Sequence, residues 1–275
     1  MYRPSELHLF LNELGIAPKK GLSQNFLIDG NIIRKIVKAA HVQPQDIVLE
    51  VGPGPGSLTQ ALLEAGAQVI AVEKDPVLAQ ALERLQTPTQ QLQVICQDIL
   101  QFPLNDYLTA NRQVKVIANL PYHLTTPILV YLLSQRQFFS SLTVMVQEEV
   151  ARRFTAKPSS KEYGSFTVFL QFYTFPHYAF NVSHHCFFPA PKVDSAVVHM
   201  DIKSIPALEQ GEEAFFEITC TAFKQRRKML RASLKGLFKP ERMEEALKSI
   251  GQNPLARPED LSLDEFILLY RKLYE

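Results

Sequence analysis

The sequence predicts an α/β fold with a mostly parallel sheet, followed by a small all-helical C-terminal domain. Between residues 47 and 147, short runs rich in β-branched residues alternate with runs of helical periodicity, which is typical of consecutive βαβ units. From Glu212 onward, the apolar residues recur with helical spacing only. We place the boundary in the stretch from Ser204 to Gly211, which divides the chain into residues 1–207 and 208–275.

The individual elements follow from the same periodicities. Strands are expected at residues 47–51, 69–72, 92–96, 114–118 and 142–146, and the helices between them at residues 58–64, 78–85 and 128–133. Two further β-rich runs, 165–173 and 193–202, are predicted to close the sheet as an antiparallel edge pair. The C-terminal helices are expected at residues 214–223, 227–237, 242–250 and 263–273.

The composition indicates a folded protein of a reducing compartment, and we expect a cytoplasmic location. Hydrophobic residues make up 46% of the chain and charged residues 21%, so a sizeable core is expected and disorder is not. The cysteines, Cys96, Cys186 and Cys220, are far apart, so neither a disulfide framework nor a cysteine zinc site is indicated. No signal peptide or membrane span is recognisable. The net charge of +1 argues against a uniformly basic surface but allows a local one.

A glycine-rich turn, residues 52–56, follows the first expected strand and reads Gly-Pro-Gly-Pro-Gly. Glycine lets the backbone bend sharply and approach a ligand, and the following helix begins with unpaired N–H groups. The spacing differs from the G-x-G-x-x-G of dinucleotide sites. Because tight turns between a strand and a helix use glycine with or without a ligand, both interpretations stay open on the turn alone.

Carboxylates end the next two expected strands. Glu73 ends the second strand, about 20 residues beyond the first glycine, where it can accept hydrogen bonds from both hydroxyls of a ribose. Asp98 ends the third strand and can accept a hydrogen bond from an adenine amino group. Either acid alone is more simply a solvated loop residue. Because the carboxyl ends of parallel strands meet at one edge of a sheet, the three strand ends together indicate a cofactor that contains adenosine.

The fourth expected strand runs into Asn119, Leu120, Pro121 and Tyr122. The exocyclic amine of a base is a poor nucleophile because its lone pair is delocalised into the ring. Acceptors on its N–H bonds, here the Asn119 side-chain oxygen and the Leu120 carbonyl, stabilise the charge that develops as the nitrogen attacks a methyl sulfonium. Tyr122 can stack on the base. The alternative is an ordinary turn, in which proline fixes φ and asparagine bonds its own backbone.

Five motifs occur in order along the chain. They are Ser23-Gln24-Asn25-Phe26-Leu27, Glu50-Val51-Gly52-Pro53-Gly54, Asn119-Leu120-Pro121-Tyr122, Phe187-Phe188-Pro189-Ala190-Pro191-Lys192-Val193-Asp194-Ser195 and Ala222-Phe223-Lys224-Gln225-Arg226-Arg227-Lys228. From about Gly21 to the C-terminal helices, the chain therefore resembles the ribosomal RNA adenine-N6 dimethyltransferase family, most closely its bacterial small-subunit type. The resemblance implies a Rossmann-like methyltransferase domain that uses S-adenosylmethionine. The implied substrate is a pair of adjacent adenosines near the 3′ end of small-subunit rRNA, and the implied partner of this expected monomer is the small ribosomal subunit, without membrane or metal.

The resemblance also implies roles for individual residues. The cofactor-binding residues would be Asn25, Leu27, Gly52, Glu73, Asp98 and Asn119. The catalytic group would comprise Asn119, Leu120, Tyr122 and Phe187, with Phe187 facing a flipped base opposite Tyr122. The chain departs from the family pattern at His123, where close relatives have asparagine, and at Ala190, which replaces a proline. Neither departure removes a residue with an implied role.

A basic run in the C-terminal domain is the expected contact with RNA phosphates. Its members are Lys224, Arg226, Arg227, Lys228 and Arg231, and no acid interrupts them. Taken alone, such a run is often only a solvated helix face.

Two other functions stay open. One is a large-subunit rRNA adenine methylase that confers antibiotic resistance, which Leu120 and the run from Phe187 to Ser195 disfavour. The other is a ribosome-assembly or transcription factor that keeps the fold without turnover. The intact Asn119 and Tyr122 argue against lost activity, although not against an added assembly role.

Overall fold

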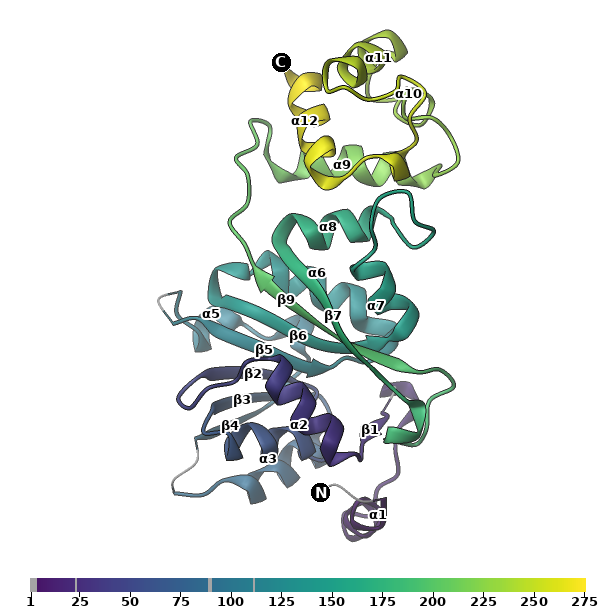
Figure 1. Ribbon diagram of the computed structural model, residues 1–275. Helices are drawn as coiled ribbons and strands as arrows, with labels where there is room; N and C mark the ends of the chain where they lie inside the picture. Colours follow the sequence, from purple (N-terminus) through teal and green to yellow (C-terminus); the bar gives the residue numbers. More distant parts are fainter. Residues whose placement is uncertain (1–3, 23, 89–90, 111) are drawn as a thin grey trace. The chain divides into compact units, whose positions relative to one another are not determined.

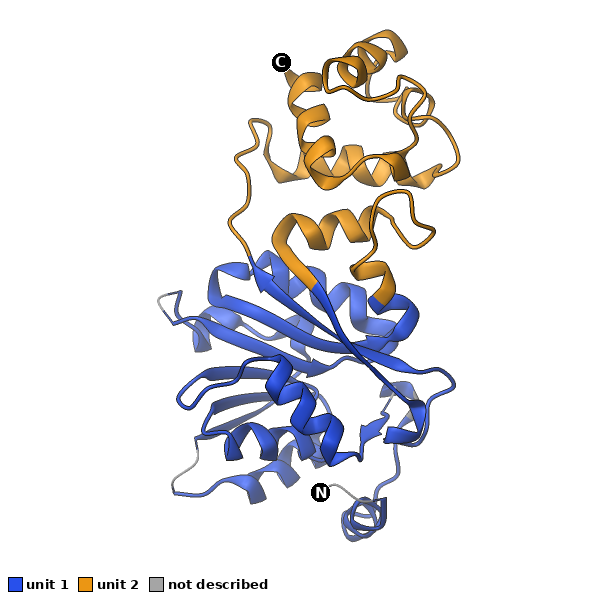
Figure 2. Ribbon diagram, viewed as in Figure 1, with its two compact units in different colours: residues 1–151, 177–202 blue, residues 152–176, 203–275 orange. Residues whose placement is uncertain are grey.

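The computed structural model describes residues 4–22, 24–88, 91–110 and 112–275. The chain forms two compact units, called unit 1 (residues 1–151 and 177–202) and unit 2 (residues 152–176 and 203–275; Figure 2). The predicted boundary at residue 207 differs from this division, because residues 152–176 group with the C-terminal helices.

Unit 1 is built around a seven-stranded sheet, counted over the described residues, with the strand order β4-β3-β2-β5-β6-β9-β7 (Figure 1). The strands are β2 (Ile47–Val51), β3 (Gln68–Glu73), β4 (Leu92–Cys96), β5 (Val114–Asn119), β6 (Phe139–Gln147), β7 (Thr174–Val182) and β9 (Ser195–Ile202). Adjacent strands from β4 to β6 run parallel, and β9 pairs with β6 antiparallel. A separate antiparallel ladder joins β1 (Phe26–Leu27) to β8 (Phe187–Phe188). The predicted parallel sheet is therefore confirmed.

The central strands are apolar on both faces, as expected for a parallel sheet covered on both sides. In β2, Val48 and Leu49 are both 0% exposed, and in β5 the same is true of Val116 and Ile117. The predicted connecting helices are α3 (Ser57–Glu64), α4 (Pro76–Leu82) and α6 (Thr125–Ser134), with the short α5 (Leu104–Tyr107) before β5. Four α-helices among the described residues that precede residue 155 were not predicted: α1 (Pro4–Glu13), α2 (Gly30–Ala39), α5 and α7 (Glu148–Phe154).

The prediction of a strand at residues 165–173 is wrong, because this run forms helix α8 (Ser165–Tyr173). A short run of aromatic and β-branched residues has no periodicity that separates a strand from a buried helix, and tertiary packing decides. Here the Phe172 ring stacks on Phe215 of α9 (Gly211–Lys224), with 5.0 Å between centroids. The strand itself begins directly after α8, as β7. The other predicted strand, 193–202, is confirmed as β9, which lies between β6 and the edge strand β7.

Unit 2 consists of helices, as predicted for its C-terminal part. Besides α8 and α9 it contains α10 (Leu230–Ser233), α11 (Pro240–Ser249) and α12 (Leu263–Tyr274). The predicted helix at 227–237 is much shorter than expected, since residues 225–228 form a turn and the Leu230 amide donates to the Ala256 carbonyl at 2.9 Å. No helix in the described part of the chain is long and apolar enough to cross a membrane.

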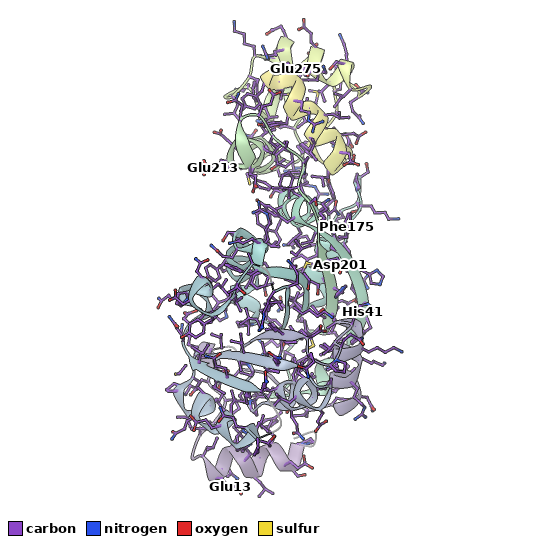
Figure 3. The ribbon with its side chains drawn as sticks, turned by 90° about the vertical axis from the view of Figure 1, so that its left-hand side faces the viewer. Glu13, His41, Phe175, Asp201, Glu213 and Glu275 are labelled. Carbon is purple, nitrogen blue, oxygen red and sulfur yellow. The ribbon has the colours of Figure 1, made fainter. Side chains whose placement is uncertain are left out.

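A buried histidine couples the stability of unit 1 to pH. His199 of β9 is 8% exposed, with Nδ1 2.8 Å from Thr143 Oγ1 and Nε2 3.2 Å from Asp201 Oδ1 (Asp201 and His41 are labelled in Figure 3). Burial lowers the pKa of His199 below its ordinary 6.5, His41 and Lys115 add to the shift, and Asp201 opposes it. Because the unfolded chain then binds the proton more readily, we expect the free energy of unfolding to decrease as the pH falls below about 6.5.

Thermal unfolding measured between pH 5 and 8 tests this coupling. The variant His199→Gln keeps a polar side chain but no titratable ring, so its unfolding temperature should decrease less over the acidic half of this range. Equal decreases in the two proteins would assign the pH dependence to other groups.

Candidate active site

A cavity in unit 1 lies at the carboxyl ends of β2, β3, β4 and β5. The strand order changes direction between β2 and β5, and ligands of open α/β sheets bind at such a point. Most of the predicted site residues of unit 1 line this one cavity, namely Asn25, Leu27, Gly52, Glu73, Asp98, Asn119, Leu120 and Tyr122. Ser23, part of the first motif, lies outside the described residues.

The glycine-rich turn after β2 adopts a backbone that favours glycine. Gly54 has φ +58° and Gly56 has φ +86°, both in the left-handed region. A Cβ on Gly56 would also lie 2.6 Å from a methyl carbon of Leu82. The turn therefore needs glycine to fold back toward the ends of β2 and β3, and the Gly54 amide uses this approach to donate to Glu73 Oε2 at 2.9 Å.

The Glu73 carboxylate is held by backbone donors on both of its oxygens. Oε2 accepts from Gly54 and Oε1 accepts from the Asp75 amide at 2.8 Å. The side chain is 6% exposed, and burial raises the pKa of Glu73 although these backbone hydrogen bonds oppose the shift. Each carboxylate oxygen has a second lone pair, so Glu73 can still accept hydrogen bonds from hydroxyl groups of a ligand.

Asp98 carries an ion pair that the sequence did not indicate. Its Oδ2 lies 2.8 Å from Lys74 Nζ, and its Oδ1 accepts from the Leu100 amide at 3.0 Å. The hydrogen bond from Lys74 lowers the pKa of Asp98, so this carboxylate is charged at neutral pH. Lys74 lines the cavity as well and was missed as a site residue, although it directly follows Glu73.

Glu50, the next-to-last residue of strand β2, is a buried acid near the Thr59 hydroxyl. Its side chain is 1% exposed, and none of the described residues donates a hydrogen bond to either of its oxygens. Burial raises the pKa of Glu50 to about 8, with a smaller contribution from the nearby Glu73, whereas the Thr59 hydroxyl opposes the shift. Because Glu50 lines the cavity, its unpaired carboxyl is a site for a cationic group of a ligand.

The end of β5 presents an amide oxygen at the cavity. Asn119 Nδ2 donates to the Asn25 carbonyl at 3.1 Å, which uses one of the two N–H donors of this amide and fixes its orientation, with Oδ1 as the acceptor. The Leu120 amide donates to the Met145 carbonyl at 3.1 Å and so extends the β5–β6 pairing by one residue. Tyr122 follows in a 3₁₀ turn (Tyr122–Leu124), where its hydroxyl lies 2.7 Å from Ser195 Oγ.

Phe187 is the predicted catalytic residue that the structure does not place at the cavity wall. It lies in β8, where it pairs with Leu27 of β1. Its side chain is 3% exposed and packs in a hydrophobic cluster with Leu27, Ile33 and Val197. In this structure the ring belongs to the core, and its contact with a base stays a prediction.

The segment beside the cavity that precedes β1 is tied to α4. Asp75, 1% exposed, caps α4 and accepts from Lys19 Nζ at 2.7 Å and from Gln24 Nε2 at 3.3 Å. Gln24 and Asn25 thereby lie along the same edge of the cavity, which both residues line. Sequence reasoning missed Lys19 and Asp75, whose ion pair joins positions far apart in the chain.

The predicted RNA-binding residues of unit 2 fall into two groups. Lys224, Arg227 and Lys228 are exposed. Arg226 instead donates to Glu259 Oε2 at 2.6 Å and to the Ser160 carbonyl at 2.8 Å, and Arg231 pairs with Glu244. The run contains no acid of its own, but the fold supplies acids from other helices.

The fold and the cavity together define an S-adenosylmethionine-dependent methyltransferase. The model of the family described as ribosomal RNA adenine dimethylase matches residues 17–274. The chain belongs to this family, and its methyl donor is S-adenosylmethionine.

Similar proteins agree with this membership. The chain is 63% identical to a ribosomal RNA small subunit methyltransferase A from Protochlamydia amoebophila, covering 100% of this chain and 98% of that protein. A protein of the same name from Chlamydia abortus is 48% identical, with 97% and 96% covered. Among solved structures, a dimethyladenosine transferase from Plasmodium falciparum has a TM-score of 0.73 at 25% identity, covering 89% of this chain and 95% of that one. The 23S rRNA methyltransferase ErmE has a TM-score of 0.72 at 27% identity, covering 91% and 100%.

Proposed function

We propose that the chain transfers methyl groups to the N6 amino groups of two adjacent adenosines in the loop of the 3′-terminal helix of small-subunit rRNA. The observation that carries this proposal is the Asn119 amide, which lines the cavity and is held there by a hydrogen bond from its nitrogen to the Asn25 carbonyl, so that its oxygen can serve as an acceptor. Such an acceptor suits an amino group that must lose its conjugation before it attacks.

The cavity residues suit a cationic cofactor. S-adenosylmethionine would supply the electrophilic methyl group. The unpaired buried carboxyl of Glu50 fits a positively charged ligand, which an apolar cavity wall would not. We assign Asn25, Leu27 and Gly52 to the methionine part, Glu73 to the ribose hydroxyls and Asp98 to the adenine amino group.

Residues at the end of β5 would bind and activate the target base. The Asn119 Oδ1 and the Leu120 carbonyl would accept the two amino hydrogens and hold the nitrogen in a pyramidal geometry. Tyr122 would stack on the base, a contact worth about 1–3 kcal/mol in single-stranded complexes. Phe187 stays the predicted second aromatic contact, which from its present position requires the β8 segment to move.

The choice of substrate rests on the relatives named for the small subunit at 63% and 48% identity. The likeness to ErmE keeps a large-subunit substrate as the alternative. Radiolabelled methyl transfer to immature small subunits and to large-subunit rRNA separates the two. We expect label in the small subunit only, at two adjacent adenosines, and label confined to large-subunit rRNA would contradict the proposal.

We further propose that the protein acts in the cytoplasm, as a monomer, during biogenesis of the small subunit. No group of acids, histidines and cysteines suited to a metal ion occurs among the described residues.

The exposed bases of unit 2 are expected to contact RNA phosphates. Replacing Lys224, Arg227 and Lys228 with glutamine should reduce the slope of log affinity against log salt by about 2, because each lost phosphate contact in single-stranded RNA removes about 0.7. Filter binding of rRNA at several salt concentrations measures this slope. Arg226→Gln should mainly lower the stability of unit 2, since this guanidinium is bound to Glu259 and Ser160.

A control of equal charge change is available on α2. The residues Arg34, Lys35 and Lys38 are exposed in unit 1, and their replacement with glutamine should leave the slope unchanged. Equal slopes for the two triple variants would refute a specific role of the unit 2 residues.

A further inference from the structure

A hydrogen bond between distant parts of the chain fixes the aromatic residue at the cavity. The Tyr122 hydroxyl lies 2.7 Å from Ser195 Oγ, although 73 positions separate the two residues. Tyr122 is partly buried and lines the cavity, whereas Ser195 is 0% exposed and lies outside the cavity lining. We infer that Ser195 is a positioning residue, which holds the Tyr122 ring in the orientation that receives the target base. This inference rests on the proposed function.

The serine is itself rigidly anchored. It is the first residue of β9 and pairs with Gln147 at the end of β6. The carbonyl of its neighbour Asp194 accepts from the Glu148 amide at 3.0 Å. The Asp194 carboxylate accepts from the His184 amide at 2.9 Å and contacts His184 Nδ1 at 2.7 Å. Because these backbone and side-chain hydrogen bonds fix Ser195, its hydroxyl keeps its position when a ligand enters the cavity. It can therefore hold the Tyr122 hydroxyl in place.

The hydroxyl of Tyr122 serves orientation and not proton transfer. Burial raises the pKa of Tyr122, so the phenol stays protonated at neutral pH. A tyrosine ring rotates about two side-chain torsions, and a hydrogen bond at its far end restricts both. Stacking requires the ring plane to lie parallel to the base. A ring that is already oriented loses less conformational entropy when the base binds.

The same bond can be removed from either side. In Ser195→Ala and in Tyr122→Phe the aromatic ring remains but the hydrogen bond is lost. We expect each variant to lower kcat for methyl transfer about tenfold, with little change in the KM for S-adenosylmethionine. Because both changes delete one interaction, the double variant should be no slower than either single variant.

A spectroscopic signal distinguishes positioning from general damage. RNA that carries 2-aminopurine at the target adenosine loses fluorescence when the base stacks on an aromatic ring. Wild-type protein should quench this fluorescence, and both single variants should quench it less. Ser195→Thr keeps a hydroxyl and should restore part of the quenching. Ser141→Ala is the matched control, because Ser141 is a buried serine of the β6–β9 pair outside the cavity lining, and it should behave as wild type.

Two failures can be told apart. Additive losses in the double variant, or wild-type quenching in Tyr122→Phe, would overturn the role of Ser195 even if Ser195→Ala folds poorly, since Tyr122→Phe leaves β9 unchanged. Failure of the proposed function would appear in the wild-type protein itself, as absence of methyl transfer to the small subunit.

Discussion

Replacing Asn119 with alanine should lower the rate of methyl transfer by about 10²–10³-fold, the loss typical when one preorganised hydrogen-bonding group is removed from an active site. The amide oxygen is the acceptor that remains once Nδ2 is bound to the Asn25 carbonyl at 3.1 Å. Without it, the amino group of the base keeps its conjugation and the developing charge loses a fixed dipole. Single-turnover transfer of labelled methyl groups to immature small subunits measures the chemical step without product release.

The control for this variant is an exposed asparagine. Asn31→Ala alters α2, where the exposed Asn31 accepts a hydrogen bond from Arg34 at 2.7 Å, and should leave the rate unchanged. An Asn119→Ala enzyme with wild-type activity would refute the assigned role of the β5 end. A loss of cofactor affinity without a loss of rate at saturating cofactor would show that Asn119 acts in cofactor binding and not in the methyl-transfer step.

The parallel strands and the strand-end residues were predictable because both are local properties of the sequence. Buried parallel strands are nearly continuous apolar runs, so residues 47–51 were predicted with the bounds that β2 has. Residues 92–96 were also predicted with the bounds of β4, although this edge strand is only partly buried. The topology of such sheets then brings successive strand ends to one edge. Glu73, Asp98 and Asn119 consequently line one cavity, although they lie far apart in the chain.

What the sequence could not predict depends on contacts between distant residues. The aromatic run 165–173 has strand-like composition and becomes a helix because Phe172 packs on Phe215. The Phe187 ring suits a contact with a base as well as a place in the core, and only the pairing of β8 with β1 directs it into the core. Arg226 was predicted to contact RNA, but in the folded protein its guanidinium forms an ion pair with Glu259. In each case the deciding partner is remote in sequence.

Glu50→Gln should make the ligand-free protein more stable while weakening cofactor binding. The Glu50 carboxyl has a pKa of about 8 in the folded protein and 4.5 as an ordinary side chain, so between these values folding requires uptake of a proton. The folded state binds more protons than the unfolded state, and the contribution of Glu50 to stability therefore decreases as the pH rises from 4.5 to 8. At pH 7 the free energy of unfolding is therefore lower by about 3 kcal/mol than it would be if Glu50 were protonated in both states. Glutamine has no such proton uptake, so its unfolding temperature should be higher by several degrees and less dependent on pH.

The same substitution should reduce affinity for S-adenosylmethionine about 10–100-fold, the usual range for a lost hydrogen bond to a charged group. A cationic ligand stabilises the ionised form of Glu50, so binding to the wild-type protein should release a proton and strengthen as the pH rises toward 8. Calorimetry in buffers of different ionisation enthalpy detects this proton.

The variant Glu64→Gln, at an exposed carboxylate on α3, is the control and should change neither property. A Glu50→Gln protein that binds the cofactor as tightly as wild type, or that releases the same proton, would exclude Glu50 as the partner of the cation. The combination of higher stability and weaker binding is the outcome that sets Glu50 apart from a structural core residue, because removing a structural residue lowers stability. An acid that destabilises the empty protein is retained where a ligand later compensates its charge.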